Sequence, residues 1–262
     1  MSRFYCFISA ASLLVLLSAC KKKDTVTDPP ASNEPTPAAN AKVIVSMNYT
    51  FGNDNFALQQ WYKTENGDSL RIRKFVYYLS NIVLVKADGT RYTEPNSYHL
   101  LTFSNTSTPS FTLSDVPEGE YTKLEALIGV DSLRNCSGSQ TGDLDQAKGM
   151  FWTWNSGYIF SKLEGTSPKS PGNFDVTYHI GGFKGVNKTQ RSISLPIGAT
   201  ALKASVTSAA QLLLKTDVAE VFKNPAKINV ANTYYVMNEG AAAASIADNY
   251  KDMISVKGVV NP

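Results

Sequence analysis

Short runs of β-branched and aromatic residues recur along most of this 262-residue chain, and Gly, Pro, Asn or Ser bounds each run. Such runs are typical of strands, and the scarcity of helical patterns between them favours an antiparallel arrangement over βαβ units. Helical patterns appear only late, in residues 218–223, which Thr216 or Asp217 can cap, and in residues 241–253. The sequence therefore predicts an all-β protein, an antiparallel β-sandwich with one or two short C-terminal helices. The main predicted strands cover residues 43–49, 70–85, 98–103, 111–113, 121–130, 173–183, 191–197, 202–214 and 254–260.

Residues 1–19 have the pattern of a lipoprotein signal peptide. Arg3 supplies a positive charge, residues 13–17 form an apolar run too short to span a bilayer as a stable helix, and Leu17-Ser18-Ala19-Cys20 closes the segment. The closing tetrapeptide resembles a bacterial lipobox, whose cysteine is acylated and becomes the mature N-terminus. Acyl chains contribute roughly 0.8 kcal/mol per buried CH2, so several chains hold a protein stably on a membrane. We expect a protein lipid-anchored at Cys20, periplasmic or on the cell surface, with the outer membrane as the expected site.

Residues 20–41 have the composition of a disordered tether. Three consecutive lysines are followed by four prolines among Ala, Ser, Thr and Asn, a mixture that does not support a packed core. No second linker, repeat or low-complexity tract interrupts residues 42–262, so a single β-sandwich domain is predicted there.

Three cysteines occur in the chain, and they do not predict a disulfide. Cys6 leaves with the signal peptide and Cys20 carries lipid, so Cys136 has no partner for an intramolecular bond. Cys136 stands in a run of small polar residues, which favours an exposed thiol, with metal ligation as the alternative.

The most unusual stretch is residues 149–165, which holds two of the three tryptophans. With a period of two, Met150, Trp152 and Trp154 share one face with Tyr158 and Phe160, as in a buried strand. The Asn-Ser-Gly run in its middle predicts a bulge or bend. Two interpretations follow: an aromatic core strand, or a soft-metal or redox site in which a thioether lies beside oxidisable indoles.

Several enzyme classes lack their motifs here. The chain has no GxSxG elbow, P-loop, GxGxxG or HExxH sequence, and no spacing singles out a pair of catalytic carboxylates. We therefore predict that the protein is not an enzyme. Basic residues are not interleaved with aromatic ones, so no nucleic-acid partner is expected.

The two histidines are the most informative polar residues. His179 lies in a predicted strand on the face opposite Val176, Tyr178 and Ile180, whereas His99 shares a face with apolar neighbours and is expected to be partly buried. Imidazole suits copper, and thioethers select Cu(I). His179, His99 and Met150 would therefore form a cuprous site if the fold brings them together.

Six ordered motifs resemble those of the MbnP-like (methanobactin-partner) proteins, and the resemblance runs from about Lys42 to the end of the chain. They are residues 75–82 (FVYYLSNI), 116–121 (VPEGEY), 128–132 (IGVDS), 142–145 (GDLD), 149–158 (GMFWTWNSGY) and 178–181 (YHIG).

The resemblance implies an exported β-sandwich protein with copper binding in its best-known members. In those members histidines coordinate the metal, and a tryptophan is oxidised to kynurenine by a partner di-haem enzyme of the cytochrome c peroxidase type. By this resemblance the histidine role falls on His179 and less directly on His99, and the oxidised residue is Trp152 or Trp154. The implied function is copper acquisition or handling by a membrane-anchored protein. The alternative is a surface lipoprotein that binds a glycan or a protein without metal, or that is purely structural.

Overall fold

Strict alternation of buried and less buried side chains shapes the first strand, β1 (Ala41–Phe51), in which Val43, Val45 and Met47 are fully buried. This period of two is what a strand with one face on a core requires. The computed structural model describes residues 40–153 and 157–262, which lie within one compact unit, Ala38–Pro262. No helix in these described residues has the length and apolar character needed to cross a bilayer.

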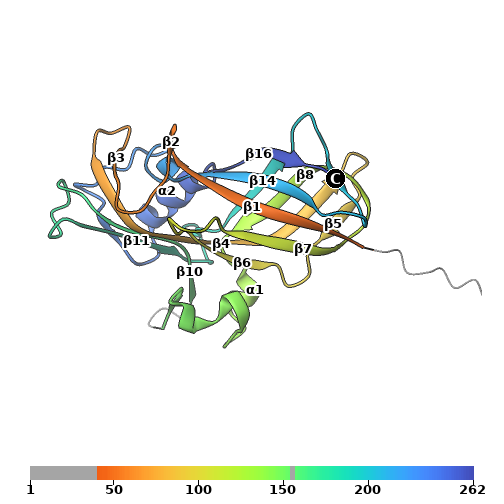
Figure 1. Ribbon diagram of the computed structural model, residues 1–262. Coiled ribbons are helices and arrows are strands. Elements are labelled where there is room, and N and C mark those ends of the chain that lie inside the picture. The colour runs from red at the N-terminus through yellow and green to blue at the C-terminus, as the bar shows by residue number, and fades with distance from the viewer. Residues whose placement is uncertain (1–39, 154–156) are drawn as a thin grey trace, which may run out of the picture. The chain divides into compact units, whose positions relative to one another are not determined.

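The first sheet is built around β1 and has five strands among the described residues (Figure 1). β1 pairs in parallel with β14 (Ala210–Asp217) and antiparallel with β7 (Ser110–Val116) and β2 (Asp54–Asn55). β14 pairs antiparallel with β16 (Ile254–Val260) at its other edge.

The second sheet is built around β4 (Ser69–Lys86), the longest strand, and has eleven strands among the described residues. Leu79 of β4 pairs with both His99 and Ile128, while Val76 pairs with both Thr102 and Lys162. Both edges of β4 are therefore occupied. One edge carries β3 (Trp61–Lys63), β6 (Tyr98–Thr102) and β5 (Arg91–Thr93), and the other carries β10 (Gly157–Thr166) followed by β8 (Gly119–Ile128).

The remaining strands of this sheet extend it beyond β8 and β10. β12 (Arg191–Pro196) and β13 (Leu202–Ala204) pair with β8, and β11 (Asp175–Gly181) pairs with β10. β15 (Tyr235–Val236) runs parallel to β11, and β9 (Phe151–Trp152) pairs antiparallel with β10.

The main core lies between the two sheets and includes Phe75, Tyr77 and Leu79 on the inner face of β4. At the end of the unit that carries β3 and β11, helical elements extend this core (Figure 1). They are the 3-10 helix η3 (Val218–Phe222) and the helix α2 (Ala241–Tyr250), whose buried side chains include Ile246 and Tyr250.

A second, smaller core covers part of the outer face of the same sheet. The segment between β8 and β10 lies against this face and contains α1 (Ser132–Asn135), η1 (Gly142–Leu144), η2 (Gln146–Lys148) and β9 (Figure 1). Two tyrosine hydroxyls fix the segment: Tyr78 donates to the Asp143 carbonyl at 2.8 Å, and Tyr158 donates to the Leu144 carbonyl at 2.6 Å. The buried members of this second core are Val76, Tyr78, Val130, Leu144, Met150, Trp152, Tyr158, Ile159 and Phe160.

The all-β sandwich and its late helices are confirmed, with two differences in detail. Two strand pairs, β1 with β14 and β11 with β15, are parallel. Residues 202–214 form two strands rather than one. Of the two residues predicted to cap η3, Asp217 has this role, because its carboxylate accepts from Ala219 N.

The prediction of one bent strand over residues 149–165 is wrong. Trp152 pairs with Gly157 and Phe151 with Tyr158, so the chain reverses between β9 and β10 and forms a hairpin. Asn155 and Ser156, which were expected to bend a strand, lie outside the described residues.

Candidate metal-binding site

His179 lies on the outer face of the second sheet, in β11. Val176, Tyr178 and Ile180 are buried toward the main core, so alternation turns His179 to the opposite face, as predicted. Its ring Nε2 lies 2.8 Å from Oε1 of Glu164 on the neighbouring strand β10. Because an ionised carboxylate only accepts hydrogen bonds, this contact places the ring hydrogen on Nε2 and leaves a lone pair on Nδ1.

Burial lowers the pKa of His179, and its hydrogen bond to Glu164 opposes this shift. The charge of Lys162 adds to the lowering. A neutral imidazole held by a carboxylate is the arrangement in which histidine ligates metals, because the carboxylate fixes both the tautomer and the ring orientation.

Lys162 connects the histidine to the second core. Its strand register places it opposite both His179 and Val76, so the three side chains form one row across the outer face. The lysine is buried, and its Nζ donates a short hydrogen bond to the carbonyl of Gly149. Burial lowers the pKa of Lys162, with a smaller effect of the same sign from Lys74. This hydrogen bond ties the start of the β9 segment to the strand that carries Glu164.

Met150 and Trp152 lie on the same face as His179. Both are buried in the second core, with exposed fractions of 2% and 3%. The backbone carbonyl of Met150 accepts from Ile159 N at 2.9 Å. The Trp152 ring packs on Gly181, two residues after His179: a Cβ built there would lie 2.8 Å from Cζ3 of the indole. The hairpin therefore brings a thioether, an indole and a carboxylate-held imidazole to one side of one sheet.

His99 lies on the opposite face. It pairs with Leu79 of β4. Val76, which lies in the same row as His179, is an odd number of residues from Leu79, so Leu79 and His99 face the opposite side of the sheet and point between the two sheets. There its ring stacks on Phe111 of the first sheet, with centroids 3.7 Å apart, and its Nε2 lies 2.8 Å from Oε2 of Glu94. The fold thus separates the two histidines by the thickness of the sheet. One metal ion does not contact both.

The other predicted site residues are placed as follows. Cys136 is exposed directly after α1, as expected for a free thiol. Trp154 and Cys20 lie outside the described residues. Within residues 40–153 and 157–262, no group of three or more His, Cys, Asp or Glu side chains is arranged to hold a metal.

Two residues of this site, Glu164 and Lys162, were not predicted. The signal for them was weak: a lysine and a glutamate two residues apart in an otherwise apolar aromatic strand, hence on one face. Only the register of β10 with β11 shows that this pair faces the histidine.

Fold and site together define a class of protein, a β-sandwich whose outer face carries a buried Met–Trp hairpin beside a histidine–carboxylate pair. A model of the MbnP family matches residues 40–239, so the chain belongs to the MbnP family. The solved structure of MbnP from Methylosinus trichosporium has the same fold, with a TM-score of 0.50 and 14% sequence identity over 77% of this chain and 81% of that one. No curated protein sequence matches the chain.

Proposed function

We propose that this protein is a lipid-anchored extracytoplasmic copper-binding protein that acts in copper acquisition or handling and not as a catalyst. The observation that carries the proposal is the His179–Glu164 pair, a partly buried neutral imidazole whose free nitrogen is available to a metal. Membership of the MbnP family supports it.

The chemistry of the available donors fits Cu(I) better than a harder ion. Thioether sulfur is a soft donor that selects Cu(I), imidazole nitrogen suits copper, and this face carries both, from Met150 and His179. In this proposal His179 binds the metal through Nδ1, Glu164 orients the ring, and Met150 supplies sulfur. His99 has no part in the site, because it faces the interior of the sandwich.

Titration calorimetry with Cu(I), on a chain that begins at residue 38, tests the proposal. We expect binding tighter than about 1 µM, lost in His179→Ala, weakened in Met150→Leu and unchanged in His99→Ala. The His99 variant is the matched control, since it removes an imidazole from the other face of the same sheet. Binding weaker than micromolar in both the parent and a partner-modified form, or equal loss in both histidine variants, contradicts the assignment.

A di-haem cytochrome c peroxidase-like enzyme is the proposed partner, and it would oxidise Trp152 or Trp154 to kynurenine. That conversion opens the indole ring, releases one ring carbon as formate and leaves one added oxygen on the side chain, so it is a four-electron oxidation whose electrons the partner would have to accept. Mass spectrometry of protein from copper-starved native cells should show the modification on the peptide that contains residues 150–158. An unmodified peptide from those cells counts against this partner.

Lipid anchoring at Cys20 is proposed from the signal pattern alone. Cys20→Ala should move the protein from the membrane fraction to the soluble fraction. The alternative of a metal-independent ligand site built from stacked aromatics is disfavoured by burial, because Trp152 and Tyr158 are enclosed in the second core and do not face a ligand.

A further inference from the structure

Three aromatic side chains project into solvent at one end of the second sheet. Trp61 on β3 is 50% exposed, Tyr235 on β15 is 63% exposed, and Phe174, directly before β11, is 58% exposed. They are the aromatic members of the large exposed hydrophobic side chains in the described part of the chain. Phe174 also has a positive φ of 67°, a left-handed conformation that is costly for a bulky residue.

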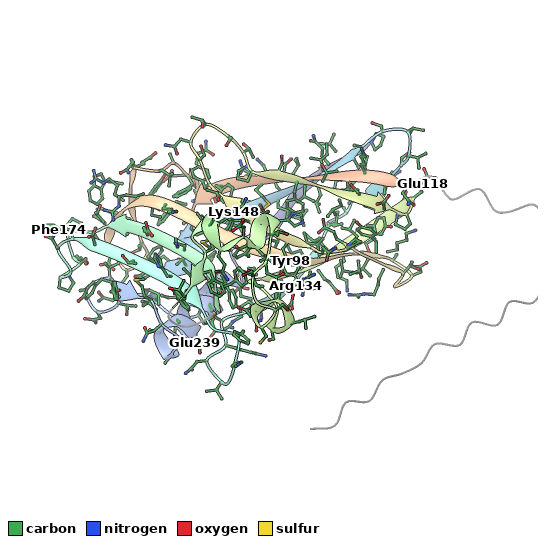
Figure 2. All side chains as sticks on the ribbon, turned by 90° about the horizontal axis from the view of Figure 1, so that it is seen from below. Tyr98, Glu118, Arg134, Lys148, Phe174 and Glu239 are labelled. Carbon is green, nitrogen blue, oxygen red and sulfur yellow. The ribbon has the colours of Figure 1, made fainter. Side chains whose placement is uncertain are left out.

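Strand register places Trp61 and Tyr235 on the same outer face. Trp61 is opposite Arg71, which is opposite Thr166, which in turn is opposite Asp175. Tyr235 is opposite Thr177, two residues beyond Asp175 and on the same side of the strand. Four strand spacings separate the two rings, or about 19 Å. Seen from below, β10 and β11 lie in front at this end, with no other ribbon over them (Figure 2).

Cations occupy the space between the aromatic rings. Arg71 lies under Trp61, with its guanidinium carbon 5.2 Å from the ring centroid. A β-bulge in β4 then turns two consecutive residues outward: Arg73 and Lys74 are both exposed, although their neighbours Ile72 and Phe75 are buried.

The acids of this surface already have partners. Asp175 pairs with Arg73 at 3.0 Å, and Glu164 is hydrogen-bonded to His179. Neither Arg71 nor Lys74 forms a salt bridge with any described residue. The surface, which we name the Trp61–Tyr235 face, therefore has an excess of positive charge.

This arrangement is the reverse of a protein–protein interface. Such interfaces concentrate aromatic anchors at their centre and keep charged side chains at the rim. Here the aromatic rings stand at the margins and the cations lie between them. Tryptophan and tyrosine at the edges of a basic surface are typical of proteins that contact lipid headgroups, where the rings enter the interfacial layer and the cations meet anionic phosphates.

We propose that the Trp61–Tyr235 face rests on the surface of an anionic phospholipid bilayer. The chain ahead of β1 allows this, because about 20 residues separate Cys20 from Ala41 and reach up to about 70 Å when extended. β1 begins at the end of the unit away from β3 (Figure 1). A lipid-anchored chain needs only weak affinity in this face, because anchoring keeps it at high local concentration near the bilayer. The proposal that this contact forms in the cell therefore rests on the proposed lipid anchor at Cys20.

The test uses residues 38–262, which contain both hydrophobic cores and lack Cys20. Vesicles of phosphatidylethanolamine with phosphatidylglycerol should sediment the protein at low ionic strength, whereas phosphatidylcholine vesicles should not. Salt at about 0.5 M should release it, because screening shortens the range of surface charge. Trp61→Ala should weaken sedimentation, and the blue shift of the parent's tryptophan emission on binding should be absent from that variant.

A charge-reversal pair provides the matched comparison. Arg73→Glu with Lys74→Glu should lower partitioning at least about thirtyfold. Lys184→Glu with Lys257→Glu makes the same change in net charge at exposed positions elsewhere and should bind like the parent.

Other outcomes overturn the proposal. These are no sedimentation with either vesicle type, equal sedimentation with both, or equal loss in the two charge-reversed pairs. Retention on an immobilised acidic protein without vesicle binding also overturns it and assigns the face to a protein partner. Because the tested chain lacks Cys20 and needs no metal, none of these results bears on lipidation or copper binding, which the fractionation and calorimetry test separately.

Discussion

Gly181 is the position at which the β9–β10 hairpin meets the strand of the candidate ligand, and Gly181→Ala tests that contact. A Cβ there would lie 2.5 Å from the Tyr158 carbonyl oxygen and 2.8 Å from Cζ3 of Trp152. Real Cβ atoms do not approach other atoms so closely, so the backbone or the indole must move. Tyr158 resists such movement, since its N–H donates to Asn135 Oδ1 at 3.0 Å and its hydroxyl to Leu144.

The expected cost follows from that rigidity. Forcing an extra methyl group into a packed site costs about 1–3 kcal/mol. Gly172→Ala is the matched control, because the nearest atoms to its Cβ, at 2.4 and 2.7 Å, belong to the ring of Tyr234, a partly exposed side chain, and not to a backbone carbonyl. Neither glycine has a positive φ, so the comparison isolates packing from backbone strain.

Urea denaturation followed by circular dichroism measures both variants, with unchanged m-values as the criterion that only stability has changed. In a Trp152→Phe background, Gly181→Ala should cost less than in the parent, because the shorter ring removes one of the two clashes; a coupling of about 0.5–3 kcal/mol is expected. A Gly181→Ala cost within about 0.5 kcal/mol of the control, the range of a neutral surface change, refutes the packing described for this hairpin.

Three further predictions concern His179, its partner Glu164, and Asp217 at the end of β14. The free energy of unfolding should fall as the pH drops from about 6.5 through the lower pKa of His179 in the folded state, because the unfolded state binds the proton more readily in this range. Thermal denaturation at several pH values measures this dependence. His179→Gln should remove it, and His99→Gln should keep it. Glu164→Gln should lower the His179 pKa further, by removing a hydrogen bond that favours the charged ring; NMR resolves this easily with two histidines in the chain, and a rise would contradict the contact. Asp217→Ala should lower the free energy of unfolding, measured by chemical denaturation, by about 1–3 kcal/mol, because the Asp217 carboxylate accepts hydrogen bonds from both Gly52 N and Ala219 N. A decrease below about 0.3 kcal/mol would show that water replaces both bonds.

Local pattern was sufficient for most strands and for the direction of single side chains. The alternation in residues 173–183 correctly turned His179 away from the core, and apolar neighbours correctly indicated a partly buried His99. These predictions depend on one strand at a time, and steric alternation fixes them within a few residues.

The relation between strands could not be predicted in the same way. That the two histidines face opposite sides follows from the pairing of Val76 with Lys162 and of Leu79 with His99, contacts between segments far apart in sequence. The hairpin at residues 149–165 was missed for a similar reason, because a turn and a bulge use the same residue types and only the partner strand distinguishes them. Glu164 became a site residue only through register.

The pairing of β4 along both edges has a consequence for how the protein is made. Every strand that pairs with β4 lies between residues 61 and 166, and β10, the last of them, covers residues 71–77. Until β10 is available, the edge of β4 at residues 71–77 presents unpaired backbone groups, which are a template for association with other chains. A newly made chain is therefore prone to associate with other chains along this edge until β10 is in place.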